Sequence, residues 1–418
     1  MVARKSQKIF PLLTKNTTVT SFTDKNPKPQ ATWLLVLITS MSTLALSIIA
    51  PSLPGIAESF LVTPESAQRV LTVYLLMLGL GQLIFGPVSD RFGRRLTLLV
   101  GLGLYLLGSV LASFAPNLEF LVLARFIQGL GASAAMVLPR VIINDTHQPR
   151  AAAASLAAVT AAMQITPMIS FPLGGLLFEF FGWRGSMVVT AVLGVVTIVS
   201  VLTLLQETNN ARQKHLRLAS VAVDYLSLTK NKQFLLFAVI SAAPPSIFFA
   251  FLNFFPFAFK NLGYSASEFG YFMILLPTTF IFGNLISRKL TPTLGITKMV
   301  RLGSLIIVAG IAVMAGLVFL GFESVWGLVL PGMVYSLGAG FSQSNATMGA
   351  INAVGQSVRG LGSGLAGSLQ MLLSSGIAAS TILLGAAEDT RIGVGILLLI
   401  AIASFVATLF MVKDSEDT

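Results

Sequence analysis

Arg125 and Gln128 are the polar side chains best placed for chemistry, because they lie one helical turn apart inside a long apolar segment. Arg125 lies about seven residues from one end of that segment, a depth of roughly 10 Å at 1.5 Å per residue of helix. A charge at that depth is costly, and such residues usually face a cavity and serve function. A guanidinium keeps its proton at cellular pH, so Arg125 offers a fixed positive charge. The alternative is an arginine that snorkels to the membrane interface.

The rest of the chain holds few groups that could perform catalysis. It contains no cysteine, and its two histidines, His147 and His215, fall in polar segments. Thiolate chemistry is therefore excluded, and neither a histidine metal site nor a Ser-His-Asp triad is expected. No aspartate or glutamate lies deep in an apolar segment, and no phosphate-binding loop is present. We expect no enzyme, no cofactor, no metal site and no ATP-driven pump. A membrane enzyme or a non-transporting receptor is the weakest alternative.

Lipid must be the solvent for the elements that position these residues. Apolar residues make up 55% of the chain and charged residues 10%, whereas soluble domains carry roughly 25% charged residues. A helix needs about 20 apolar residues to cross the hydrocarbon core of a bilayer. Twelve such stretches are present, near residues 33–54, 66–88, 96–115, 118–142, 152–177, 184–205, 233–258, 267–290, 298–320, 324–349, 358–383 and 390–412. We predict an all-α membrane protein with twelve transmembrane helices.

The polar segments divide the chain. We predict a tail (1–30), a first six-helix bundle (31–205), a basic linker (206–232), a second six-helix bundle (233–412) and a short tail (413–418). The middle of the linker, Leu216 to Leu228, can form a short helix on the membrane surface.

The basic residues orient the chain in the membrane. Of its 27 lysines and arginines, 22 fall on the side of the two tails and four on the other side. Because cytoplasmic loops collect lysine and arginine, we expect both termini in the cytoplasm and the protein in the inner (plasma) membrane. The same bias explains the net charge of +11 without a nucleic-acid partner.

The loop after the second predicted span carries the first specific motif. Its sequence from residue 86 to residue 95, GPVSDRFGRR, resembles the G-x-x-x-D-R-x-G-R-R/K loop between spans two and three of the major facilitator superfamily. Its glycines permit close helix approach and a sharp turn, and its aspartate can cap a neighbouring helix N-terminus. The resemblance implies a gating loop of Gly86, Asp90, Arg91, Gly93, Arg94 and Arg95; the alternative is an ordinary basic loop. A degraded copy at residues 283–288 indicates an internal six-span repeat.

Three further motifs resemble the Bcr/CflA branch of drug:proton antiporters or its superfamily. Residues 124–132, ARFIQGLGA, resemble an R-x-x-Q-G-x-G-A element whose arginine is implicated in proton coupling or substrate contact. Residues 140–145 are similar to the branch's R-x-x-x-x-D, which places Asp145 where it can pair with Arg94 or Arg95; the alternative is a solvated aspartate. Span five resembles the antiporter signature through two prolines and two glycines that permit bending and tight packing: Pro167, Pro172, Gly174 and Gly175. The alternative is a kinked helix without directional meaning.

The resemblance implies two pseudo-symmetric six-helix bundles around a central cavity, with alternating access by rocking of the halves. The polar residues on its cavity-lining spans are the candidate substrate site: Tyr74, Arg125, Gln128, Gln164, Asn253, Asn284, Gln343, Asn345 and Gln370. The implied function is proton-coupled export of an amphipathic drug-like or metabolite molecule, including an anionic one such as a siderophore. An uptake permease or facilitator for a small organic solute is the alternative. The expected partners are a small-molecule substrate, protons and the lipid bilayer, and we expect a monomer.

The chain departs from this apparent branch at Ser47, where many relatives carry an aspartate. Without a deep carboxylate, a cavity that contains Arg125 suits a neutral or anionic substrate better than a cation. The remaining acidic candidates for proton coupling, Asp90 and Asp145, lie at the ends of predicted spans. We therefore predict that coupling runs through Asp145, while Arg125 supplies fixed positive charge.

Overall fold

The computed structural model describes residues 29–209, 218–322, 324–355 and 358–411. Twelve helices among these residues are long and apolar enough to cross a membrane, which confirms the predicted number of spans. The first six spans are α1 (Thr32–Ser47) with α2 (Leu53–Phe60), α3 (Pro64–Phe92), α4 (Arg94–Ser113), α5 (Leu118–Thr146), α6 (Pro149–Phe181) and α7 (Trp183–Leu204). The second six are α9 (Lys232–Asn261), α10 (Ala266–Phe272) with α11 (Leu275–Leu294), α12 (Ile296–Phe319), α13 (Val325–Asn352), α14 (Arg359–Leu383) and α15 (Thr390–Leu409).

The first span is broken, although hydropathy predicted one continuous helix over residues 33–54. Helix α1 ends at Ser47, a 3-10 turn follows over Ala50–Ser52, and α2 carries the span on to Phe60. Pro51 and Pro54 each lie at the start of a new segment, where the missing N–H of proline has no intrahelical partner to lose. The prolines therefore redirect the span without ending it. The eighth span is divided in the same way between α10 and α11.

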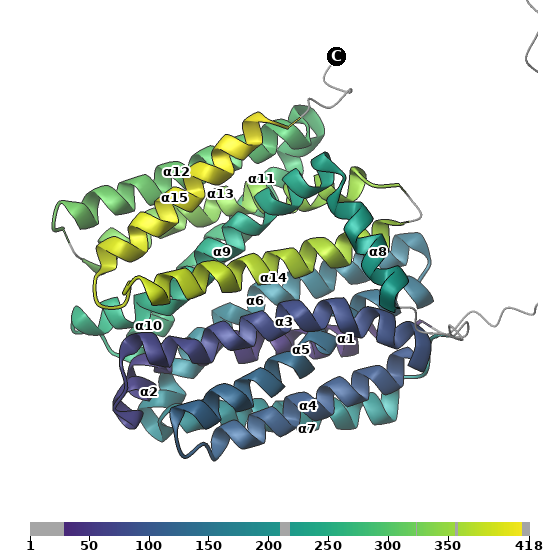
Figure 1. The fold of residues 1–418 in the computed structure, drawn as a ribbon, viewed down its shortest axis with the longest axis horizontal. Coiled ribbons are helices and arrows are strands. Elements are labelled where there is room, and N and C mark those ends of the chain that lie inside the picture. The colour runs from purple at the N-terminus through teal and green to yellow at the C-terminus, as the bar shows by residue number, and fades with distance from the viewer. Residues whose placement is uncertain (1–28, 210–217, 323, 356–357, 412–418) are drawn as a thin grey trace, which may run out of the picture.

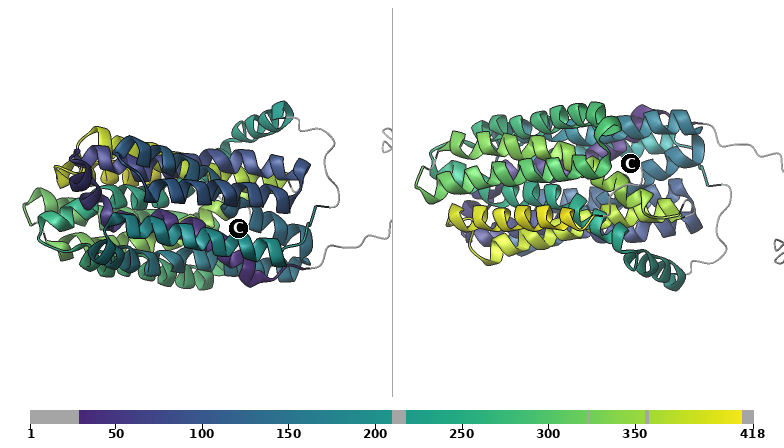
Figure 2. Two further views of the ribbon diagram at one scale, coloured as in Figure 1. Left: turned by 90° about the horizontal axis from the view of Figure 1, so that it is seen from below. Right: turned by 90° about the horizontal axis from the view of Figure 1, so that it is seen from above.

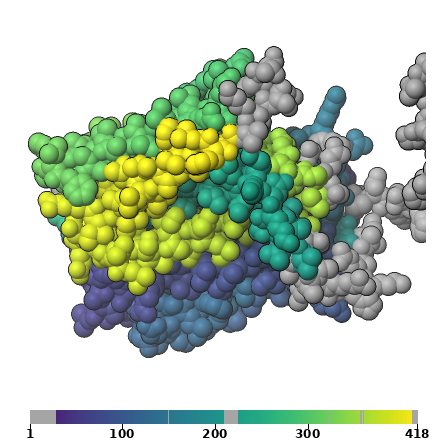
Figure 3. Space-filling view, turned by 45° about the horizontal axis from the view of Figure 1, so that its top comes forward, coloured from purple at the N-terminus to yellow at the C-terminus, as the bar shows by residue number. Residues whose placement is uncertain are grey.

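Helices α1–α7 form one half of the molecule and α9–α15 the other (Figure 1). The described ends of the first and last spans lie at the same end of the molecule, which we call the terminal end. The opposite end, where α2 leads into α3 and α9 leads into α10, is called the distal end. Helix α14 of the second half rests along α3 of the first half, on the face that Figure 3 shows.

The linker contains helix α8 (Leu218–Thr229), which agrees with the predicted linker helix except that Leu216 lies outside the described residues. It projects to the side at the terminal end (Figure 2) and packs against α9 and α14 of the second half. Buried Leu228 anchors it in an apolar cluster with Phe234 and Phe237.

The halves meet along α3 and α14 and close together at the distal end. Three polar contacts join them there: Ser375 Oγ to the Thr72 carbonyl (3.2 Å), Lys260 to Glu58, and the Ser267 amide to Glu179 Oε1 (3.0 Å). Phe171 of α6 adds an apolar contact, because its ring packs edge-on against Phe248 and Phe269 of the second half. The distal end is therefore the closed end in this structure.

Candidate functional site

Arg125 is fully buried in the first half and does not snorkel. Its guanidinium donates to the carbonyls of Ala45 (3.1 Å) and Val70 (3.3 Å) and to Gln128 Oε1 (2.5 Å). The guanidinium carbon lies 4.1 Å from the centre of the Tyr74 ring, a cation–π contact. The remaining nitrogen, Nη2, has no hydrogen-bond partner among the residues that the structure describes. Arg125 therefore ties α1 and α3 to its own helix, α5.

Gln128 extends this network toward the outer helices of the first half. Its Nε2 donates to Ser109 Oγ of α4 (2.7 Å) and to Thr190 Oγ1 of α7 (3.2 Å). Tyr74 completes the group, because its hydroxyl donates to the Ser42 carbonyl (2.9 Å). These three predicted site residues thus lie together inside one bundle. No aspartate or glutamate pairs with Arg125 among residues 29–209 and the other described ranges.

The candidate residues of the second half do not join this group. The side-chain amides of four of them form hydrogen bonds with other residues of the second half. The hydrogen bonds are Asn253 Nδ2 to the Ala378 carbonyl (3.2 Å), Ser344 Oγ to Asn284 Oδ1 (2.7 Å), Asn345 Nδ2 to Ser287 Oγ (2.7 Å) and Gln370 Nε2 to Ser241 Oγ (3.1 Å). Gln343 of α13 and Gln164 of α6 are half-buried. A shared substrate cavity for all nine residues remains a prediction.

The gating loop is organised around Arg94, which is almost fully buried. Its guanidinium donates to Ser89 Oγ (2.6 Å), Asp90 Oδ1 (2.5 Å) and Asp145 Oδ2 (2.9 Å). The predicted pairing of Asp145 with Arg94 or Arg95 therefore forms with Arg94. Gly93 has a φ of 99°, a conformation that favours glycine, so the sharp turn is also confirmed.

Two expectations for this loop are wrong. Gly86 does not bring helices close together, because a Cβ added there would meet nothing within 4 Å. Asp90 does not cap the next helix, since its carboxylate is held by Arg94. Arg91 takes no part in the contacts of Arg94. It is exposed, and its guanidinium carbon lies 5.0 Å from the centre of the Phe92 ring.

Glu207 is the residue that caps α4, and the sequence did not reveal it. Its carboxylate accepts from the backbone amides of Arg94 (2.9 Å) and Arg95 (3.3 Å), the first two residues of α4. Asn209 acts on the preceding helix, since its Nδ2 donates to the Asp90 carbonyl (2.9 Å) at the end of α3. The start of the linker therefore clamps the α3–α4 corner. The cap and the corner lie too far apart in sequence for motif spacing to connect them.

We expect Glu207→Ala to lower the free energy of unfolding by about 1 kcal/mol, the usual cost of losing an N-terminal cap. Glu207→Gln should cost less, because its amide oxygen can still accept one hydrogen bond. Thermal unfolding of the purified protein in detergent measures both. Glu119→Ala is the matched control, since Glu119 forms an exposed ion pair with Arg69, which contributes little. Equal melting of Glu207→Ala and Glu119→Ala would contradict the capping role.

The two neighbouring glycines of α6, Gly174 and Gly175, pack closely against different halves of the molecule. A Cβ on Gly174 would lie 2.1 Å from the Ile48 carbonyl oxygen of the same half. A Cβ on Gly175 would lie 2.4 Å from the Ala266 carbonyl oxygen of α10, in the other half. Gly270 of α10 makes the reciprocal close contact, since a Cβ added to it would lie 2.5 Å from the Phe171 carbonyl oxygen of α6. Pro167 and Pro172 both lie in the interior of α6. The signature glycines thus sit where the distal end closes.

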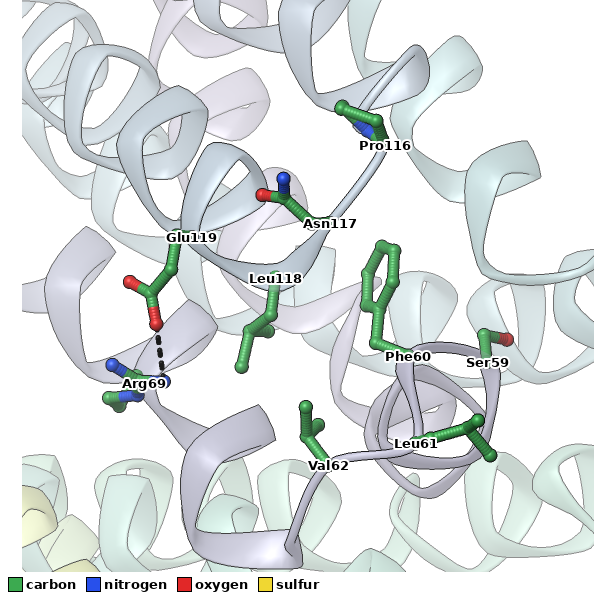
Figure 4. Close-up of a pocket in the computed structure, with 9 residues that line it drawn as sticks. All are labelled: Ser59, Phe60, Leu61, Val62, Arg69, Pro116, Asn117, Leu118 and Glu119. Atoms are coloured by element: carbon green, nitrogen blue, oxygen red, sulfur yellow. Dashed lines mark hydrogen bonds and ion pairs between the residues drawn. The ribbon is translucent and has the colours of Figure 1, made fainter.

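A surface pocket of about 410 Å³ opens at the distal end of the first half, between the α2–α3 and α4–α5 connections (Figure 4). Phe60, Val62 and Leu118 contribute apolar surface to it. Its two charged residues pair with each other, Arg69 Nη2 to Glu119 Oε1 at 2.8 Å. None of the predicted site residues lines this pocket.

Comparison with known proteins links this architecture to transport. Residues 35–379 match the family model described as Major Facilitator Superfamily. The chain is 27% identical to the multidrug resistance protein D of Escherichia coli, over 83% of this chain and 86% of that protein. It is 27% identical to a chloramphenicol resistance protein of Pseudomonas aeruginosa, over 74% of each chain. The crystal structure of a D-xylose-proton symporter superimposes with a TM-score of 0.74 at 15% identity, over 93% of this chain and 98% of that one.

Proposed function

Because the chain belongs to the major facilitator superfamily, and is therefore a multi-pass membrane transporter and not an enzyme, we propose that it is a proton-coupled exporter. Its substrates are amphipathic molecules, uncharged drugs such as chloramphenicol and anionic metabolites such as a carboxylate siderophore. Export is supported by its likeness to two drug-resistance proteins and by the proline and glycine pattern of α6. The terminal end faces the cytoplasm in this proposal, because 22 of the 27 basic residues fall on that side.

The observation that carries the mechanism is the close packing of the two halves at the distal end. Gly175 of α6 packs on the backbone of α10, and Glu58 pairs with Lys260, both at the distal end. Alternating access requires two six-helix units that close at one end while the other end is free to open. These contacts suit that requirement, since they join the halves at the end opposite the linker.

The substrate preference follows from the charges buried in the first half. Arg125 is a buried cation that pairs with no carboxylate among the described residues. A second cation near it would be repelled, while an anion or a polar neutral molecule would not. Ser47, where an aspartate would favour cationic drugs, is buried and uncharged. The proposed substrates are therefore neutral or anionic.

The proposed coupling residue is Asp145, held by Arg94 at the terminal end. Protonation of Asp145 would break this ion pair and release α5 from the α3–α4 corner. In inside-out membrane vesicles, we expect chloramphenicol uptake to increase when the vesicle interior is made acidic, because protons then leave as the drug enters. Asp145→Asn should remove this dependence on the pH gradient, while Glu119→Gln, a distal carboxylate outside the coupling network, should retain it.

Two results would contradict parts of this proposal. Wild-type uptake that ignores the imposed gradient would make the protein a facilitator or a transporter coupled to another ion. Uptake by Asp145→Asn that still follows the gradient would place the coupling group elsewhere.

A further inference from the structure

A stripe of α3 faces the second half of the molecule. Gln68, Thr72 and Gly79 are spaced so that they lie on one side of the helix. The Thr72 carbonyl accepts from Ser375 of α14 (3.2 Å), and a Cβ on Gly79 would lie 3.0 Å from the Leu372 side chain of α14. Gln68 therefore also faces the second half, one helical turn further toward the distal end.

The side-chain amide of Gln68 makes no hydrogen bond to the described residues at that position. Its side chain is fully buried, and neither its amide oxygen nor its amide nitrogen has a hydrogen-bond partner among the described residues. The Thr72 hydroxyl is in the same condition. A buried amide without partners costs free energy in the closed state, because it has lost its hydrogen bonds to water.

Asn253 of α9 approaches the same level from the second half. It is fully buried, its Nδ2 donates to the Ala378 carbonyl of α14 (3.2 Å), and its Oδ1 has no partner among the described residues. Ala378 lies one turn distal of Ser375, just as Gln68 lies one turn distal of Thr72. Because α3, α9 and α14 contact one another, we infer that the unpaired amide of Gln68 and the unpaired Oδ1 of Asn253 lie at one level of the boundary between the halves.

We propose that Gln68 and Asn253 form a substrate subsite that receives an uncharged hydroxyl group when the halves separate at the distal end. This inference rests on the proposed export function, and it specifies which chemical group of the substrate is bound near the distal end. Two amides offer donors and acceptors but no charge, so they select polar neutral groups. A site built to hydrogen-bond a group discriminates against the analogue that lacks it, because its own polar atoms are then left unpaired.

The test compares chloramphenicol, which has two hydroxyl donors, with its 1,3-diacetate, in which both are masked. In inside-out vesicles, Gln68→Leu and Asn253→Leu should each lower chloramphenicol export by about tenfold, equivalent to about 1.4 kcal/mol. Export of the diacetate should stay near the wild-type level.

The matched control is Gln82→Leu, because Gln82 is also buried on α3 but donates to the Leu78 carbonyl (3.2 Å) of its own helix. This substitution should not change the ratio of the chloramphenicol export rate to the diacetate export rate. Equal loss of both compounds in Gln68→Leu would show that the residue serves closure, and would overturn the inference.

A binding measurement separates this inference from the export function. Ala379, one turn distal of Ser375 on the α3-facing side of α14, can be changed to cysteine in a chain that has none. Chloramphenicol should slow maleimide labelling of purified Ala379→Cys, and the added Gln68→Leu change should remove that protection. If the wild type exports neither compound, the export proposal fails, and protection lost with Gln68→Leu would still support the subsite. If chloramphenicol gives no protection, the subsite is refuted whether or not export occurs.

Discussion

Replacing Gly175 with alanine should nearly abolish export while leaving the protein folded. The added Cβ would lie 2.4 Å from the Ala266 carbonyl oxygen and 2.6 Å from the Cα of Ser267, and both are backbone atoms of the other half. Alanine favours the helix itself, by about 1 kcal/mol over glycine, so the penalty falls on closure of the distal end. Overpacking typically costs about 1–3 kcal/mol, and every 1.4 kcal/mol is tenfold. The ratio of molecules closed at the distal end to molecules open there should therefore fall by about five- to 140-fold.

Two measurements check this expectation. Chloramphenicol uptake into inside-out vesicles should drop, and the thiol of Ala379→Cys should react faster with maleimide, because the distal end stays open. Gly376→Ala is the matched control, since Gly376 lies in α14 and a Cβ there would meet nothing within 4 Å. Unchanged export and unchanged thiol reactivity in Gly175→Ala would show that this contact does not close the transporter.

Arg125→Lys should lose most of its transport of neutral and anionic compounds alike, although the positive charge is kept. The guanidinium donates in three directions, to Ala45 of α1, Val70 of α3 and Gln128 of α5. A lysine ammonium is a compact point charge and cannot reproduce that planar fork. Hydrogen bonds to a charged group contribute about 1.5–3 kcal/mol each. We therefore expect a lower melting temperature in detergent and a loss of export of at least about tenfold, since 1.4 kcal/mol is tenfold.

Arg69→Lys provides the comparison for this variant. Arg69 forms an exposed pair with Glu119, so the same substitution there should change neither melting nor export measurably. If Arg125→Lys exports neutral and anionic substrates as well as the wild type does, the charge alone matters. If it loses only anionic substrates, the side chain acts on the ligand and not on the packing of α1, α3 and α5.

Hydropathy predicted the spans well because each helix must satisfy its own backbone in lipid, which demands a long apolar run. The breaks at Pro51 and in the eighth span escaped prediction, since the apolar run continues through them. Asp145 and Arg94 were paired correctly because a known motif placed both at the same membrane face. Glu207 escaped prediction because capping depends on how α7 ends beside α4, which no local pattern records. The unpaired amide of Gln68 and the unpaired Oδ1 of Asn253 became visible only when the helices were packed together.

The contacts of Glu207 and Asn209 with the α3–α4 corner determine where the chain can be divided into two separately expressed fragments. Glu207 and Asn209 follow the last helix of the first half, yet they hold α3 and α4 together. Helix α8, by contrast, is anchored to the second half through Leu228. Two separately translated fragments should therefore reassemble when the cut falls between residues 209 and 218. A cut just after α7 would leave the first fragment with an uncapped α4, while a cut after α8 would detach that helix from the chain that anchors it.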